Sequence, residues 1–355
     1  MRPLSAIDAI GPAWNHTRRL LPTPRNWRLF LKIGAVAFFA QVGGCNGSYN
    51  APVHGWNGHS ASLVAATVAI AITAAVLALV IGLIFFYLRS RLQFVLFEVV
   101  LRSETMIAPI WRRYGRATWY WMALKILFFL AATICALPIL IPIVLAFIHS
   151  AGPAFSNGEL RNPAAFFLAI LAFLGAMFFL FLVIGIAYLL LHDFGLPSMA
   201  LESTSLSETA RRVWHLLRAE PGAVLLYVLM RFLLGIACAL AADCVLFFAA
   251  LIALIPFGGA AVIDWFSLRN ASFAGHVAMI TIWVVLGLVF LALLFLAAIM
   301  LLGYVFVFMQ AYALYFLGGR YPLVGEYLAP FLPPPHPYAA MPPIHPPPMV
   351  PPTTP

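Results

Sequence analysis

The fold of this chain is decided by residues 206–242, LSETARRVWHLLRAEPGAVLLYVLMRFLLGIACALAA, where a basic amphipathic segment runs directly into a long apolar run. Apolar residues such as Leu206 and Val213 fall on one face of a helix, and the arginines fall on the other. Ser205 and Glu208 have the spacing of a capping box at the start of that helix. A basic amphipathic helix followed by an apolar run is typical of an interfacial helix leading into a membrane span. The stretch therefore predicts an all-α membrane protein.

The composition supports this class. Hydrophobic residues make up 64% of the 355 residues and charged residues only 9%, with a mean hydropathy of +1.00. Soluble globular domains have roughly 45–50% apolar and about 25% charged residues. The excess of 20 Lys and Arg over 11 Asp and Glu is typical of a membrane protein with basic cytoplasmic loops, so we expect no nucleic-acid partner.

About 20 apolar residues cross the roughly 30 Å of bilayer hydrocarbon, and the chain has about six apolar runs that could do so. These runs are residues 27–42, 61–88, 119–148, 164–191, 222–255 and 276–317. The first run is short. The last is long enough to hide a second crossing. Only Gly287 and Gly303 could form a turn in it, so we favour one long tilted helix, or one span plus an interfacial piece. The predicted fold is a polytopic transmembrane helical bundle.

The placement of Lys and Arg predicts the orientation. Of the 20 basic residues, only Arg161 and Arg269 fall in loops on the expected outer side. The positive-inside rule then places both termini in the cytoplasm of a bacterium, with the spans in its inner membrane. The predicted organisation is a cytoplasmic amphipathic segment at 1–26, which we expect to be interrupted near Gly11-Pro12, a transmembrane domain at 27–322 and a disordered proline-rich tail at 323–355.

An arginine pair recurs three times, each time in an amphipathic segment with one Trp that precedes apolar runs. The pattern predicts three repeated units of an amphipathic helix and a helix pair. We call the basic residues of these segments the arginine collar: Arg18, Arg19, Arg112, Arg113, Arg116, Arg211, Arg212 and Arg218. The collar could bind anionic lipid headgroups or an acidic membrane-protein partner. Plain anchoring at the cytoplasmic interface explains the same residues, and the two explanations stay open.

Asp243 is the strongest single candidate for an intramembrane functional site, because an ionisable side chain near the middle of the bilayer is energetically costly and often functional. Arg231 lies twelve residues away on the same predicted helix, about 18 Å along the axis, so the two cannot pair within the helix. We expect Asp243 to be protonated or bonded to a hydroxyl of a neighbouring helix, such as Thr281 or Tyr304. A structural role, a proton or cation relay, and misplacement of the span remain open.

No catalytic or cofactor pattern is present. A phosphate-binding Gly-rich loop, a nucleophile elbow and a zinc-protease motif are all missing from the sequence. The inner-side acids lie near arginines at helical spacing and are interpreted as solvated: Glu98, Glu104, Asp193, Glu202, Glu208 and Glu220. His54 and His59 are interpreted as solvated loop residues rather than a metal pair. Cys45 follows a short lipoprotein-like box, but the leader before it is longer than a usual signal peptide.

Four segments carry a resemblance: residues 14–21 (WNHTRRLL), 43–47 (GGCNG), 211–223 (RRVWHLLRAEPGA) and 308–317 (FMQAYALYFL). In them the chain resembles an uncharacterised bacterial multi-pass membrane family, which is similar to the membrane domain attached to some glycerophosphoryl diester phosphodiesterases. The likeness covers residues 5–322. It implies no activity, because this chain lacks the soluble phosphodiesterase domain with its metal-binding acids.

The functional prediction is a non-enzymatic membrane protein, a scaffold or partner subunit with a basic cytoplasmic face and no cofactor. The alternative is a transporter or lipid-handling protein with a cavity around Asp243. A transporter should have a polar cavity that reaches Asp243, whereas a scaffold should have a sealed bundle and an exposed basic or apolar surface.

Overall fold

The computed structural model describes residues 3–21, 27–41, 61–103, 106–151, 155–156, 159–160, 163–202, 204–268 and 273–331. The fold is all-α, as predicted. The described β structure is a two-residue pairing of β1 (Phe155–Ser156) with β2 (Glu159–Leu160), antiparallel, between two long helices. Residues 332–355 of the proline-rich tail, together with Cys45, His54, His59, Glu104, Arg161 and Arg269, lie outside the described residues.

Five described helices are long and apolar enough to cross a membrane. They are α3 (Ala61–Arg102), α5 (Gly115–Ala151), α6 (Pro163–Leu190), α9 (Pro221–Leu268) and α10 (Phe273–Gly318). The preference for one long helix in the last apolar run is confirmed, because α10 is continuous over 46 residues. The expected first span corresponds to α2 (Trp27–Gln41), which has 15 residues and is therefore about 22 Å long, short of the hydrocarbon thickness.

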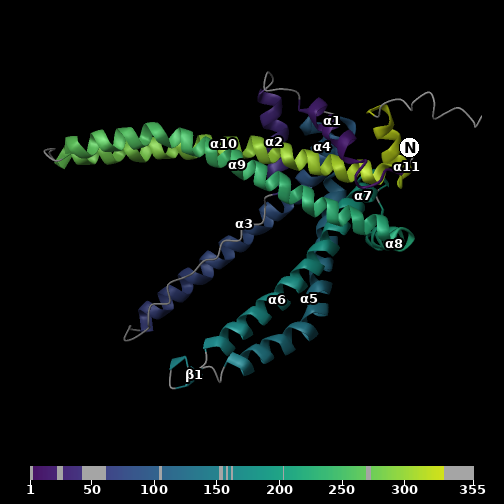
Figure 1. The fold of residues 1–355 in the computed structure, drawn as a ribbon, viewed down its shortest axis with the longest axis horizontal. Coiled ribbons are helices and arrows are strands. Elements are labelled where there is room, and N and C mark those ends of the chain that lie inside the picture. Colours follow the sequence, from purple (N-terminus) through teal and green to yellow (C-terminus); the bar gives the residue numbers. More distant parts are fainter. Residues whose placement is uncertain are drawn as a thin grey trace, which may run out of the picture.

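The long helices meet in one body and diverge from it as arms (Figure 1). The body contains the inner ends of the long helices and the short elements between them. Those elements are α1 (Ile10–Leu20), α2, α4 (Ile107–Arg113), the π turn η3 (Leu191–Gly195), α7 (Leu196–Glu202), α8 (Leu206–Ala219), α11 (Pro322–Leu328) and the 3₁₀ turn η4 (Ala329–Phe331). The arms are the outer part of α3, the α5–α6 pair and the α9–α10 pair. Residues 68–85 of α3 are exposed on every side.

The core of the body is built around the last turns of α10. Residues 311–317 of this helix are all buried, and they are apolar apart from two tyrosine hydroxyls. Tyr227 of α9 stacks between Tyr312 and Phe316, with ring centroids 5.5 and 4.4 Å apart. Residues 92–101 of α3 pack against the same helix. A helix that is apolar all round needs neighbours on every side, and here the body supplies them.

Helices α2 and α10 cross at a pair of glycines. A Cβ atom added to Gly303 would lie 2.4 Å from the Cα atom of Gly34, and one added to Gly34 would lie 3.2 Å from the carbonyl oxygen of Ile299. Small residues allow two helix backbones to approach this closely. Phe38 packs edge-on against Phe295 on one side of the crossing. Gly303 is therefore a helix-packing residue inside a continuous helix and not a turn.

Two details of the N- and C-terminal segments differ from expectation. Helix α1 runs without interruption through Gly11 and Pro12, because proline in the first turn removes only a donor that has no partner there anyway. The expected boundary at residue 323 falls inside α11, where Val324 and Leu328 are fully buried against the body. The predicted cap of α8 is confirmed, since the Glu208 amide donates to the Ser205 hydroxyl at 3.4 Å.

Candidate functional site

The body encloses a charged pair that joins three helical elements. Asp193 lies in the π turn η3 with 1% of its surface exposed, and Arg231 of α9 reaches it with Nε 3.3 Å from Oδ2. The Tyr227 hydroxyl donates to the same oxygen at 2.6 Å, and His192 Nδ1 lies 3.0 Å from Oδ1. Arg231 also donates to the carbonyl of Met309 on α10. A buried ion pair is tolerated only when its remaining hydrogen-bonding groups are satisfied, as they are here.

Asp193 was expected on a solvated face, and that interpretation is wrong. Asp193 lies in the π turn at the end of α6, and its carboxylate contacts Arg231 of α9. Single π turns inside helices are frequent at functional sites. Arg231 is 38 residues away in sequence, so helical spacing could not have predicted this pair. The signal available in the sequence was Arg231 itself, because an arginine in an apolar run requires a partner.

Asp243 is not part of this network. Its side chain is exposed on α9, and no described residue donates a hydrogen bond to it. Neither hydroxyl expected as a partner donates to it: Thr281 donates to the carbonyl of Val277 in its own helix at 2.8 Å, and the ring of Tyr304 packs against Trp14. The structure therefore separates Asp243 from Arg231 and from both expected hydroxyl partners.

A second buried polar cluster surrounds Lys125, which has 2% of its surface exposed. Its ammonium donates to Gln93 Oε1 at 2.7 Å and to the Ser90 hydroxyl at 3.1 Å. The indole N–H of Trp121 donates to the same Gln93 oxygen at 2.9 Å, and the Lys125 ammonium lies 5.2 Å from the centroid of this ring. Neutral acceptors and an aromatic face thus hold this cation, without a carboxylate among the described residues.

A third cluster centres on Glu98, which is fully buried rather than solvated as expected. Its carboxylate lies 3.1 Å from Arg102 Nε and 2.5 Å from Arg113 Nη1, and it accepts from the Tyr114 hydroxyl. Burial, reinforced by this hydrogen bond to Glu98, raises the pKa of Tyr114. The two arginines line a cavity of about 430 Å³ together with Arg116.

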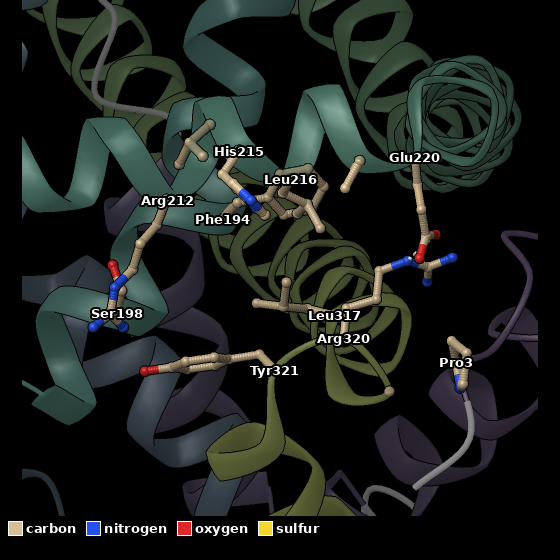
Figure 2. A pocket seen from close by; sticks show the side chains of 13 residues that line it. Pro3, Phe194, Ser198, Arg212, His215, Leu216, Glu220, Leu317, Arg320 and Tyr321 are labelled. Atoms are coloured by element: carbon tan, nitrogen blue, oxygen red, sulfur yellow. Dashed lines mark hydrogen bonds and ion pairs between the residues drawn. The ribbon is translucent and has the colours of Figure 1, made fainter.

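A second cavity of about 430 Å³ opens between α7, α8 and the end of α10 (Figure 2). Its charged side chains are paired with each other. Arg320 Nε lies 2.9 Å from Glu220, and Arg212 bridges Glu202 at 2.6 Å. The Tyr321 hydroxyl also donates to Glu202, and burial together with this carboxylate raises the pKa of Tyr321. This cavity is therefore closely balanced in charge.

The arginine collar is on the surface of the body. Seven of its eight members are exposed and Arg212 is half-buried. The three arginine pairs lie on α1, α4 and α8. Each pair is close in sequence to a tryptophan, and the Arg218 guanidinium stacks 5.0 Å from the ring centroid of Trp214. The described residues contain no group of three or more His, Cys, Asp or Glu side chains with the arrangement of a metal site.

Comparison with known proteins gives a family without an assigned activity. No curated protein and no solved structure matches the chain. The model of one family of unknown function (DUF7544) matches residues 4–326. This match covers most of the 355 residues, and the chain therefore belongs to this family of unknown function.

Proposed function

We propose that the protein is a non-enzymatic membrane scaffold, a multi-pass subunit whose basic body contacts anionic headgroups or a membrane-protein partner at the cytoplasmic face of a bacterial inner membrane. The observation that carries this proposal is the convergence of the long apolar helices on one body whose surface presents the arginine collar.

The electrostatics of the collar support contact with lipid. A Lys or Arg near an anionic membrane surface contributes about 1 kcal/mol of attraction, so several exposed arginines on three helices act together. The Trp214 ring lies against Arg218, and Trp14 is four residues before Arg18 on α1. Such rings are enriched where a membrane protein meets the headgroups.

The transporter alternative has less support. It requires a polar cavity that reaches Asp243, but Asp243 lines neither of the two cavities on the body and is exposed on α9. Two polar contacts inside the body tie helices together: the Asp193–Arg231 pair and the hydrogen bond from Lys125 to Gln93. These contacts favour a closed structural unit over a solute path.

The test is the effect of anionic lipid on the full-length protein in nanodiscs. We expect the unfolding temperature to rise when phosphatidylglycerol replaces part of the phosphatidylcholine. A variant with Gln at Arg18, Arg19, Arg211 and Arg218 should lose most of this rise, and high salt should remove the rest because exposed charges are screened. Lysine at the same four positions keeps the charge and should keep the response.

Two results would count against the scaffold. One is an unfolding temperature that does not depend on lipid charge in the unaltered protein. The other is a proton or solute flux into proteoliposomes that Asp243→Asn abolishes, which would establish the transporter alternative.

A further inference from the structure

The cavity beside Glu98 differs from that of Figure 2 in its unbalanced charge. It lies between the inner end of α3, the α4–α5 junction, α7 and α11, and three arginines line it: Arg102, Arg113 and Arg116. Glu98 contacts the first two, and Arg116 has no ion-pair partner among the described residues. Three guanidinium charges against one described carboxylate leave an excess of about two positive charges.

The arginines are held in place and still have donors to offer. The buried Glu98 carboxylate anchors Arg102 and Arg113 from behind, yet their side chains remain 30% and 51% exposed. The Arg102 guanidinium also stacks 4.8 Å from the ring centroid of Tyr327. A guanidinium has five N–H donors, and each of these two arginines uses only part of them on Glu98. Fixing the side chains before a ligand arrives lowers the entropy cost of binding.

The charge and the donors together fit a phosphate group. A phosphate monoester carries about −1.5 to −2 charge at pH 7, which matches the excess in the cavity. Two oxygens of a phosphate can accept the two parallel N–H groups of one arginine, and its third oxygen remains for another arginine. A carboxylate has only two oxygens and can form this paired contact with one guanidinium at a time. The lining also contains Met199, Leu201 and Leu323, which suits the organic part of a phosphate ester or the glycerol end of a lipid.

We propose that this cavity, which we call the Arg116 pocket, is a binding site for the phosphate group of a monoester. The phosphate could belong to a lipid headgroup, such as that of phosphatidic acid, or to a soluble phosphorylated metabolite. If the bound phosphate belongs to a lipid, the inference rests on the proposed scaffold function. If it belongs to a soluble ester, the inference does not, because such a ligand would bind the body whether or not the collar contacts the membrane.

Arg116→Gln and Arg112→Gln form a matched pair of variants. Both arginines are exposed and lie four residues apart, but only Arg116 lines the pocket. Arg116 has no ion pair among the described residues, so its replacement should leave the fold intact. Arg113→Lys is a second variant, which keeps the charge beside Glu98 but removes the fork of paired donors.

Binding is measured with the full-length protein in two arms. In the first, inorganic phosphate and glycerol 3-phosphate are titrated into detergent-solubilised protein by calorimetry, against chloride at the same ionic strength. In the second, native mass spectrometry counts bound lipid from nanodiscs that contain phosphatidic acid or phosphatidylcholine. We expect Arg116→Gln to weaken phosphate binding about tenfold, the effect of one lost charge-assisted hydrogen bond, and Arg112→Gln to change it less than twofold.

Binding of the soluble phosphates that depends on Arg116 would identify a soluble ester, and dependence seen only with phosphatidic acid would identify a lipid. Absence of phosphate binding in both arms, or equal losses in the Arg112 and Arg116 variants, would overturn the pocket. Neither outcome alters the phosphatidylglycerol response of the four-arginine variant, since those four positions lie outside the pocket. The two proposals can therefore fail separately.

Discussion

Replacing Gly303 with alanine should destabilise the protein more than any other glycine substitution on α10. The added Cβ would lie 2.4, 2.6 and 2.8 Å from the Cα, O and C atoms of Gly34. Carbon atoms in contact prefer about 3.5–4.0 Å, so the two helices must separate by about 1 Å at their crossing. Overpacking of a core costs about 1–3 kcal/mol, and backbone atoms cannot rotate away as a side chain can. We expect a loss of about 2–3 kcal/mol.

The chain offers two graded controls for this change. A Cβ at Gly287, on the same helix, meets no atom within 4 Å, so Gly287→Ala should be neutral or slightly stabilising. A Cβ at Gly34 lies 3.2 Å from a backbone oxygen, so Gly34→Ala should fall between the other two. The expected order of stability is Gly287→Ala, then Gly34→Ala, then Gly303→Ala.

The assay is the fraction of monodisperse protein that remains in mild detergent after stepwise heating, measured by size-exclusion chromatography. For a chain of 355 residues, a loss of about 2–3 kcal/mol corresponds to a midpoint lower by roughly 3–4 °C for Gly303→Ala. A midpoint equal to that of Gly287→Ala would refute the close crossing of α2 and α10. The same midpoint for all three variants would show that α2 is not held against α10 at this point.

Three further predictions concern charged and titrating groups. Asp193→Asn should cost about 3–5 kcal/mol of stability, because it leaves the Arg231 guanidinium buried without its carboxylate. Adding Arg231→Met should restore part of that loss in the same heating assay, whereas a double variant as unstable as the sum of the two single variants would contradict the pair. Burial lowers the pKa of His16, so the contribution of this residue to stability is complete above the ordinary pKa of 6.5 and is lost as the pH falls below it. The free energy of unfolding should therefore fall by up to about 1.4 kcal/mol per pH unit between about pH 7.5 and about pH 5, and His16→Gln should remove this slope. A slope that is unchanged in the variant would exclude His16 as its cause. Asp243→Asn should cost less than about 0.5 kcal/mol of stability, because Asp243 is exposed, and a larger loss would reveal a hidden partner.

Features that depend on local patterns could be predicted from the sequence. The apolar runs gave the long helices, because hydropathy over about 20 residues needs no knowledge of neighbours. The cap of α8 followed from Ser205 and Glu208, which interact within one turn. The arginine pairs were placed correctly on amphipathic helices at the surface, since a helix with two chemically different faces exposes its charged one.

Features that depend on contacts between residues distant in sequence could not be predicted from the sequence. Asp193 and Arg231 are on different helices, and a π turn decides which way the carboxylate points. Glu98 lies among arginines at helical spacing, and this spacing is the same on an exposed helix face and in a buried ion-pair cluster. The sequence pattern alone could not separate the two. The role of Gly303 requires a partner glycine on another helix, which spacing along one helix does not reveal.

The contacts between the two ends of the chain affect the order in which the protein can be assembled. The Tyr312 hydroxyl donates to the Ala6 carbonyl at 3.0 Å, across 306 residues, and Arg320 donates to the Leu4 carbonyl at 3.0 Å, across 316 residues. At about 5–20 residues per second, the ribosome needs roughly 15–60 s to add the intervening residues. During that time α1 and α2 have been synthesised but lack the helix on which they pack. Helices α10 and α11 therefore complete the body last, and a chain truncated before α10 should leave its N-terminal helices exposed to proteolysis.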